Sequence, residues 1–254
     1  MLATVASATL LGVEGRPIVV EVHAAQGLPC FSVVGLPDAT CREARDRVRA
    51  AVVSSGFRWP QRRVTVNLAP TSLRKAGSGL DLPIAVAVLA ADGQLDPALL
   101  DGVAFLGELG LDGSLRRVPG TLALVSTIGA GAVVVPSASA TEAALPGRHA
   151  VLAASSLAGV VGGLRGERSW DRPRHGPATD PPPRHGDLAD VRGQAVGRLA
   201  VEVAAAGGHH LLLYGPPGAG KTMLAQRLPG LLPPLEQDPA LEVTRIHSAA
   251  GLDL

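Results

Sequence analysis

Residues 209–222 constrain the fold of this chain more than any other stretch. They read His-His-Leu-Leu-Leu-Tyr-Gly-Pro-Pro-Gly-Ala-Gly-Lys-Thr, in which the last eight residues match the spacing G-x-x-x-x-G-K-S/T. Glycines let successive backbone N–H groups turn toward a polyphosphate, and a lysine at this position can reach the β- and γ-phosphates. The apolar run before the loop predicts a buried parallel strand, and helix-forming residues follow the loop.

This pattern predicts a strand, a phosphate-binding loop and a helix that together bind a nucleotide. The hydroxyl of Thr222 is expected to join the shell of a Mg²⁺ ion held with the phosphates. The residues expected to contact the phosphates are Gly215, Pro216, Pro217, Gly218, Ala219, Gly220, Lys221 and Thr222.

Composition narrows the class of protein. The 254 residues suffice for one large or two ordinary domains, and a formal net charge of +1 does not by itself indicate a nucleic-acid or membrane partner. Cys30 and Cys41 lack the spacing of a metal site, so we expect reduced thiols in a cytoplasmic protein.

The first twelve residues faintly resemble a signal peptide, but a first β-strand fits them better. The sequence contains no uncharged run of 18 apolar residues, so no membrane helix is expected.

The first part of the chain predicts an α+β domain that ends near residue 166. Alternating and continuous apolar runs predict its strands, and amphipathic or strongly apolar stretches predict its helices. A Pro-rich, polar stretch at 167–186 predicts a linker, and a second domain follows at 187–254. The expected elements of the first domain are a hairpin over 2–23, strands at 31–36, 62–70, 132–135 and 151–153, a hairpin around 111–113, and helices at 38–55, 81–91, 119–128 and 156–164.

Basic residues gather in two places in the first domain. One is the polar face of the helix at 38–55, and the other is the start of the strand at 62–70 together with the loop that follows it. A solvated surface with i,i+4 ion pairs explains the helix face, and a DNA-facing surface is the alternative. The candidate DNA contacts are Arg42, Arg45, Arg49, Arg62, Arg63, Arg74 and Lys75.

The region after the phosphate loop lacks one expected feature. Nucleotide hydrolases of this class place an acidic motif at the end of a later strand, where it holds Mg²⁺ and polarises water. The acidic residues after Thr222 are Glu236, Asp238, Glu242 and Asp253, and none follows an apolar strand run. We therefore expect a second domain that is cut short, which binds a nucleotide without turning it over.

A series of short motifs then runs through nearly the whole chain in a fixed order. They include Val-Glu-Val-His at 20–23, Gly-Leu-Pro at 27–29, Val-Gly-Leu-Pro-Asp at 34–38, Glu-Ala-Arg-Asp-Arg-Val-Arg at 43–49, Asn-Leu-Ala-Pro at 67–70, Asp-Leu-Pro-Ile-Ala at 81–85, Gly-Glu-Leu at 107–109 and Asp-Val-Arg-Gly-Gln at 190–194. In these motifs the chain resembles the YifB / ComM family of magnesium-chelatase-like AAA+ ATPases, which is linked to bacterial competence.

The resemblance implies a fold and an activity. The fold would be a domain similar to the Lon protease catalytic domain, in the ribosomal protein S5 domain 2-like fold, followed by an α/β P-loop AAA+ module. The intact protein would be a hexamer that hydrolyses ATP to move DNA branch points during natural transformation. Carried over, Val191 and Gly193 would line the adenine pocket. Walker B, sensor and arginine-finger residues have no counterpart in this chain.

The resemblance also bears on peptide cleavage. A Lon-type protease uses a serine activated by a lysine. The nucleophile would fall near Gly79 and the base near Thr121, and the only lysines are Lys75 and Lys221. We therefore predict no protease activity.

Two other functions stay open at this point. One is a magnesium chelatase subunit that inserts metal into a porphyrin, against which the Lon-like domain argues. The other is a non-enzymatic DNA-binding module formed by residues 1–165 alone.

Overall fold

The computed structural model describes residues 1–35, 39–73, 79–171 and 186–252. Contacts divide the described residues into two compact units. The first contains 1–171 together with 240–252, and the second contains 186–239. The predicted domains at 1–166 and 187–254 divide the chain differently at its C-terminal end, and that division stays a prediction.

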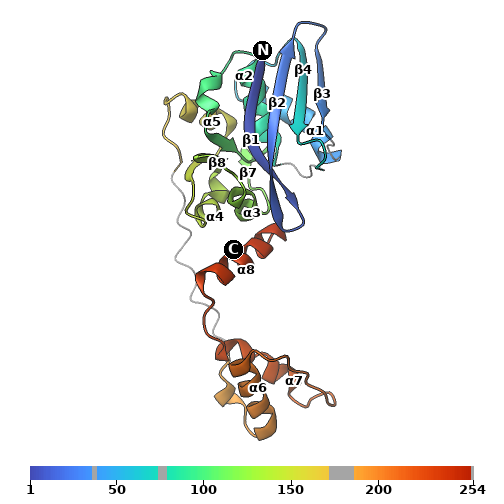
Figure 1. Ribbon diagram of the computed structural model, residues 1–254, viewed down its shortest axis with the longest axis vertical. Coiled ribbons are helices and arrows are strands. Elements are labelled where there is room, and N and C mark those ends of the chain that lie inside the picture. The colour runs from blue at the N-terminus through green and yellow to red at the C-terminus, as the bar shows by residue number, and fades with distance from the viewer. Residues whose placement is uncertain (36–38, 74–78, 172–185, 253–254) are drawn as a thin grey trace. The chain divides into compact units, whose positions relative to one another are not determined.

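A seven-stranded mixed sheet forms the centre of the first unit, in the order β3-β4-β2-β1-β5-β8-β9 (Figure 1). The predicted hairpin is confirmed: β1 pairs antiparallel with β2, and β4 pairs antiparallel with the other edge of β2. The remaining neighbours in this sheet are parallel. The strands are β1 (Leu2–Leu11), β2 (Glu14–Ala25), β3 (Cys30–Val34), β4 (Arg63–Ala69), β5 (Val103–Phe105), β8 (Ala132–Pro136) and β9 (Ala150–Ala154).

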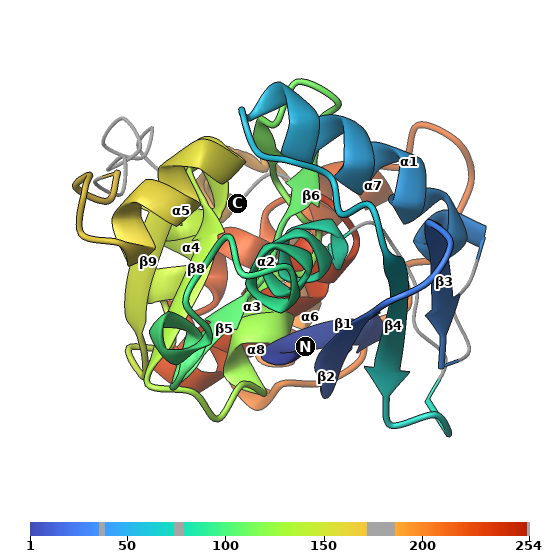
Figure 2. The same ribbon diagram turned by 90° about the horizontal axis from the view of Figure 1, so that it is seen from above.

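Helices cover both faces of the parallel end of the sheet. At the hairpin end, α1 and α2 cover one face, and α3 covers part of the other face beside β1 and β2. Figure 2 shows α1 and α2 on the same side of β1, β2 and β4. In β8, Val134 packs into the core beneath α1, α2 and α5, whereas Val133 and Val135 pack against α3 and α4 on the other face. Parallel strands covered on both faces are apolar throughout, which explains the Val-Val-Val run. The helices are α1 (Ala39–Ser54), α2 (Asp81–Ala91), α3 (Thr121–Ser126), α4 (Ala140–Ala144) and α5 (Leu157–Leu164).

Short elements complete the first unit. The predicted turn at 111–113 joins the small antiparallel sheet of β6 (Glu108–Leu109) and β7 (Leu115–Arg116). Two 3-10 helices, η1 (Pro97–Leu100) and η2 (Ser137–Ser139), and the short helix α4 were not predicted, because segments of three to five residues carry too little periodicity. No helix in the described part of the chain is long and apolar enough to cross a membrane.

Helix α2 lies in the middle of the main core, which is the larger hydrophobic cluster of the first unit and also contains Val48 of α1, Val66 of β4 and Leu157 of α5. All eleven of its residues are buried, as expected for a helix that is apolar on every side. Its first residue, Asp81, is fully buried and receives two hydrogen bonds from the Arg47 guanidinium on α1, at 2.8 and 3.0 Å. The Leu109 N–H donates to the same carboxylate at 3.3 Å. Burial raises the pKa of Asp81, while the bonds from Arg47 and Leu109 act in the opposite direction.

A second buried carboxylate, Glu142 on α4, lies on the other face of the sheet. It accepts a hydrogen bond from the Leu122 N–H at the start of α3, at 2.8 Å, and one from Arg117 at 3.2 Å. The Ser248 hydroxyl also donates to Glu142, and the Ser248 carbonyl accepts from the Gly120 N–H at 2.9 Å. Ser248 belongs to α8 (Gln237–Ala249), so Glu142 joins α3, α4 and α8 within the first unit.

Residues 167–171, predicted to begin the linker, instead pack on the first unit. Trp170 lies against the main core beside α5, at a point where Gly163 has no side chain to obstruct the indole. Asp171 donates its N–H to the Ala153 carbonyl at 2.8 Å and accepts from the Ser137 hydroxyl at 2.6 Å. Composition assigned this stretch to the linker because its neighbours are polar and proline-rich. Residues 172–185, the rest of the predicted linker, lie outside the described residues.

Candidate nucleotide-binding site

The predicted phosphate loop at 215–222 lies in the second unit and runs from residue 215 into helix α7 (Lys221–Ala225). Gly218 and Gly220 have φ values of +80° and +77°, in the left-handed region that favours glycine. The Ala219 N–H donates to the Pro216 carbonyl at 3.3 Å, which closes the turn, and the Leu224 N–H donates to the Gly220 carbonyl at 3.0 Å, which begins the helix. The sequence motif therefore forms a tight glycine loop that leads directly into a helix, as predicted.

Lys221 folds back over this loop. Its ammonium donates to the Gly215 carbonyl at 2.9 Å and to the Pro216 carbonyl at 2.7 Å. These two bonds hold one compact positive charge at the mouth of the loop. The side chain of Thr222, the next residue, is exposed and accessible to a bound ion.

The apolar segment before the loop is not a paired strand, so that prediction is wrong for this structure. Leu212 and Tyr214 are 89% and 98% exposed, and only Leu213 packs against the small core. An extended segment becomes a strand when a neighbouring strand takes up its backbone hydrogen bonds. The described residues 186–239 contain no strand that could pair with it.

Helices support the loop instead. A small core of Leu188, Val191, Val201 and Leu224 joins η3 (Leu188–Asp190), α6 (Ala195–Gly207) and α7. The predicted helix after the loop is present but short, because α7 ends at Ala225 and a 3-10 turn, η4 (Leu228–Leu231), follows it. Pro229 favours this end, because proline has no N–H to donate to the Ala225 carbonyl four residues earlier.

The predicted adenine-side residues have different environments. Val191 is 1% exposed and packs in the small core, whereas Gly193 is exposed in the turn before α6. Their role beside the base stays a prediction. The next residue, Gln194, was not predicted to act at the site, yet its side-chain amide donates to the Ala219 carbonyl in the phosphate loop at 2.8 Å. It was visible in the sequence as the last residue of the motif at 190–194.

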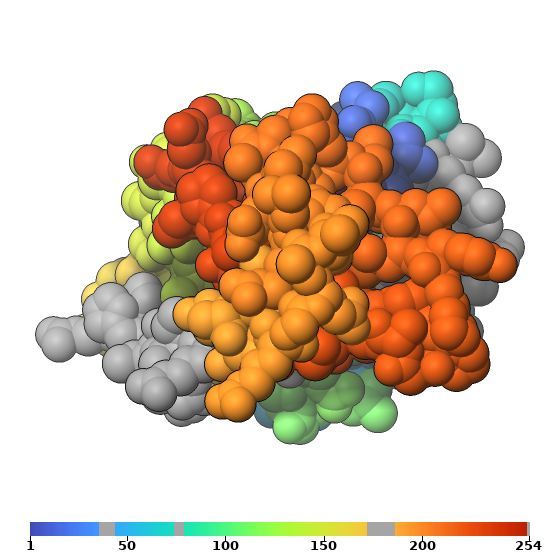
Figure 3. Space-filling view, turned by 90° about the horizontal axis from the view of Figure 1, so that it is seen from below, coloured from blue at the N-terminus to red at the C-terminus, as the bar shows by residue number. Residues whose placement is uncertain are grey.

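Helix α6 exposes an apolar stripe on the second unit. Val196, Leu199 and Val203 are 83%, 60% and 54% exposed and follow the i, i+3, i+7 spacing of one helix face. The light-orange atoms in Figure 3 belong largely to this helix and the turn before it. Away from this stripe, Val201 of α6 packs in the small core and Ala204 is buried. The stripe and the exposed segment before the loop together leave much apolar surface in contact with solvent.

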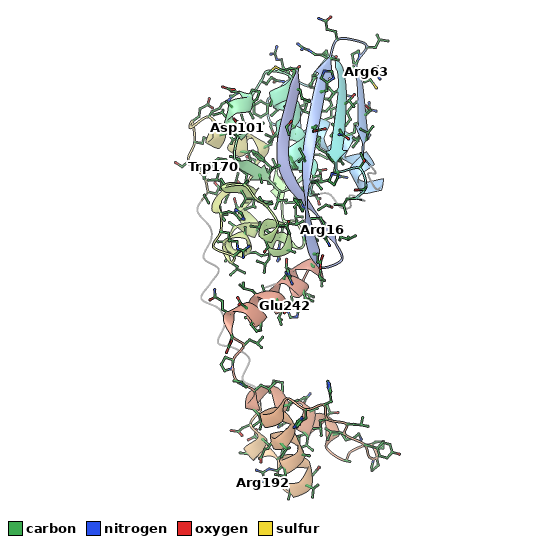
Figure 4. All side chains as sticks on the ribbon, viewed as in Figure 1. Arg16, Arg63, Asp101, Trp170, Arg192 and Glu242 are labelled. Carbon is green, nitrogen blue, oxygen red and sulfur yellow. The ribbon has the colours of Figure 1, made fainter. Side chains whose placement is uncertain are left out.

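The candidate DNA residues are spread over the first unit. Arg45 and Arg49 are exposed one turn apart on α1. Arg63 lies at the start of β4, at the end of the sheet away from the β1–β2 turn (Figure 4), and Arg62 lies 3.5 Å from Asp92 in an ion pair. The side chains of Arg42, Arg74 and Lys75 lie outside the described residues.

The structure also places the positions compared with a Lon-type protease. Gly79 lies against Val118, such that a Cβ at Gly79 would be 2.9 Å from a Val118 methyl group. Thr121 is buried at the start of α3, and its hydroxyl donates to the Val118 carbonyl at 2.7 Å. Glycine and threonine supply neither the nucleophile nor the base of a serine–lysine pair. The absence of protease activity stays a prediction.

Two family models match, "Subunit ChlI of Mg-chelatase" over residues 20–139 and "Magnesium chelatase, subunit ChlI" over residues 187–254. The uncharacterized protein YifB of Salmonella typhimurium is 45% identical over 254 residues, which covers 99% of this chain and 50% of that protein. An uncharacterized protein of Mycobacterium tuberculosis is 47% identical over 249 residues, 97% of this chain and 49% of that protein.

A third relative has a more informative name. The competence protein ComM of Haemophilus influenzae is 40% identical over 259 residues, with 100% of this chain and 51% of that protein covered. The chain thus spans about half the length of the curated relatives it matches. These matches show that the chain belongs to the YifB/ComM family of magnesium-chelatase-like proteins.

Proposed function

We propose that the second unit binds ATP with Mg²⁺ through the loop at 215–222. The observation that carries this is the position of Lys221, whose ammonium is held at the mouth of a glycine loop of the correct spacing. The backbone N–H groups of 218–222 would surround the β-phosphate, and Lys221 would contact the β- and γ-phosphates. The exposed Thr222 hydroxyl would be a ligand of Mg²⁺, and the turn at Val191 and Gly193 would face the adenine. Mg²⁺ would neutralise phosphate charge.

Replacing Lys221 with alanine tests this proposal. A hydrogen bond to a charged group contributes about 1.5–3 kcal/mol, so we expect Mg-ATP affinity to fall roughly 10- to 150-fold. The measurement is a fluorescence titration of the 254-residue chain with a labelled ATP analogue and Mg²⁺, displaced by unlabelled ATP.

The control is Lys75→Ala, which removes the other lysine of the chain and should leave the affinity unchanged. Inorganic triphosphate should compete with ATP if the phosphates are what the loop recognises. Saturable binding that survives Lys221→Ala would place the nucleotide elsewhere and overturn the proposal.

In the intact protein we propose an AAA+ ATPase in which further residues cover the exposed parts of the second unit. The extended segment at 211–214 and the stripe on α6 are the surfaces that a parallel sheet and its neighbours would bury. The first unit would be the Lon-like domain, and the assembled protein a homo-hexamer in the cytoplasm. We expect this chain to bind ATP without steady hydrolysis, because the acidic residues that follow Thr222 in the second unit, Glu236 and Asp238, do not follow a strand.

We further propose that the intact protein uses ATP to move branched DNA during natural transformation. The relative named as a competence protein supports a role in DNA uptake or recombination. The exposed pair Arg45 and Arg49 on α1 would contact phosphates, and so would Arg62 and Arg63, which lie just before β4 and at its start.

A gel-shift titration of the chain with forked DNA at several salt concentrations tests the DNA role. Each phosphate contact removed lowers the slope of log K against log salt by about 1, so Arg45→Ala/Arg49→Ala should lower it by roughly 2. The exposed Arg148 in the same unit offers a single-charge control. If the unchanged chain does not bind forked DNA at low salt, these residues do not form a DNA surface.

A chelatase subunit remains a second candidate because both matching family models are named for magnesium chelatase. An absorbance titration with a metal-free porphyrin distinguishes a chelatase subunit from an ATPase that acts on DNA. A saturable spectral shift with the porphyrin, together with no binding of DNA, would favour metal insertion.

A further inference from the structure

Gln194 has a backbone conformation that calls for an explanation. With φ at +52° it is the single non-glycine residue with positive φ among the described residues. Bulky side chains rarely adopt this left-handed conformation, and where they do, the surrounding structure holds them there, often beside a functional site. Gln194 lies between the turn at 191–193 and the first residue of α6.

The side chain of Gln194 is directed at the phosphate loop. Its Nε2 donates to the Ala219 carbonyl at 2.8 Å. A trans peptide is planar, and its C=O and N–H point in opposite directions. Because the Ala219 carbonyl points toward Gln194, the Gly220 N–H of the same peptide points away from Gln194. Gly220 is one of the positions at which such a loop donates to a phosphate.

Two glycines make room for this amide. A Cβ at Gly220 would lie 2.6 Å from the Gln194 Nε2, so an alanine there would displace the amide even apart from its φ of +77°. A Cβ at Gly197 would lie 3.4 Å from the Gln194 Oε1 and 2.9 Å from Leu224 of α7. The amide thus occupies a space that α6, the loop and α7 leave open together.

We propose that Gln194 is a positioning residue that sets the Ala219–Gly220 peptide of the phosphate loop for binding. The inference rests on the proposed nucleotide function and deepens it, because it links the turn on the adenine side to the loop on the phosphate side. Gln194 acts through the loop backbone, and so its effect falls on any polyphosphate and not on the base alone.

The experiment compares Gln194→Gly, Gln194→Ala and the control Arg192→Ala, which alters an exposed residue of the same turn (Figure 4). Gln194→Gly accepts the positive φ and removes the side chain with its amide, so comparison with Gln194→Ala separates the loss of the hydrogen bond from backbone strain. For both Gln194 variants we expect the affinities for Mg-ATP and for inorganic triphosphate to fall by the same factor, about 3- to 10-fold. Arg192→Ala should change neither affinity.

A second measurement needs no nucleotide. Amide hydrogen exchange at 218–222 in the unliganded chain should be about 3- to 10-fold faster in Gln194→Gly, because the loop loses its hydrogen bond to the amide. Exchange that is unchanged in Gln194→Gly overturns the inference, as does a loss of ATP affinity without a loss of triphosphate affinity. If the unchanged chain binds neither ligand, the nucleotide function fails, and the exchange result still decides whether Gln194 holds the loop.

Discussion

Replacing Arg47 with alanine is expected to lower the free energy of unfolding of the first unit by about 3–5 kcal/mol, because it leaves a buried carboxylate without its cation. The carboxylate is that of Asp81, which is fully buried at the start of α2 and receives two hydrogen bonds from Arg47. Both tryptophans of the chain, Trp59 and Trp170, pack on the main core. Urea unfolding followed by tryptophan fluorescence therefore reports on this unit.

The loss caused by Arg47→Ala should depend on pH. Burial already raises the pKa of Asp81 above its ordinary value of 3.8, and removing Arg47 would raise it further. A raised pKa in the folded state favours folding at low pH and loses that contribution as the pH rises. The difference between the unchanged chain and Arg47→Ala should therefore be largest at neutral pH and shrink as the pH falls.

Two variants complete this test. Arg49→Ala changes an exposed arginine on the same helix, and its effect should stay within about 0.5 kcal/mol. Arg47→Ala/Asp81→Asn should recover part of the lost stability, since it removes the buried charge as well. Equal unfolding midpoints for Arg47→Ala and Arg49→Ala would show that the pair does not stabilise the core.

Replacing Glu142 with alanine is expected to lower the free energy of unfolding by about 2–4 kcal/mol, because each buried donor left without an acceptor costs about 1–3 kcal/mol. The donors are the Leu122 N–H at the start of α3 and the Ser248 hydroxyl on α8. The Arg117 guanidinium also loses this partner, although it is a third exposed and can contact water. Tryptophan fluorescence measures this loss as well.

Two further variants apportion that loss. Ser248→Ala removes one donor only and should cost about 0.5–1.5 kcal/mol. Glu14→Ala removes an exposed ion pair with Arg16 and should cost less than about 1 kcal/mol. Glu142→Ala should also speed hydrogen exchange in α8 more than Glu14→Ala does. A Glu142→Ala chain as stable as Glu14→Ala would contradict the role assigned to this carboxylate.

Strong apolar patterns made much of the first unit predictable. The hairpin of β1 and β2 follows from alternation on either side of Gly12, and the bounds predicted for α2, 81–91, are those observed. The turn at 215–222 and the helix that follows it were predictable because glycines at fixed spacing accept positive φ; phosphate binding by this loop stays a prediction. These features depend on neighbours in sequence, or on burial so complete that every position is apolar.

Features that depend on contacts between distant segments could not be predicted from the local sequence pattern. Arg47 is one of four arginines on α1 and differs from Arg45 and Arg49 only in that α2 places Asp81 beside it. The run 211–214 has the composition of a buried strand, but a strand also needs a partner, and composition says nothing about one. Gln194 resembles any polar residue of a turn, because its positive φ and its bond to Ala219 arise only when two distant segments meet.

The membership of α8 in the first unit changes how the chain is connected. Residues 240–252 follow the phosphate loop in sequence, yet they pack with 1–171 through Ser248 and Glu142. The second unit is therefore an insertion, joined to the first unit by the chain on both sides. A single cut between residues 172 and 185 would leave the two units covalently linked through 239–240. A chain shortened at residue 239 would lose the Ser248 contact, so removing residues beyond the proposed nucleotide site would weaken the first unit, most of which precedes that site in the sequence.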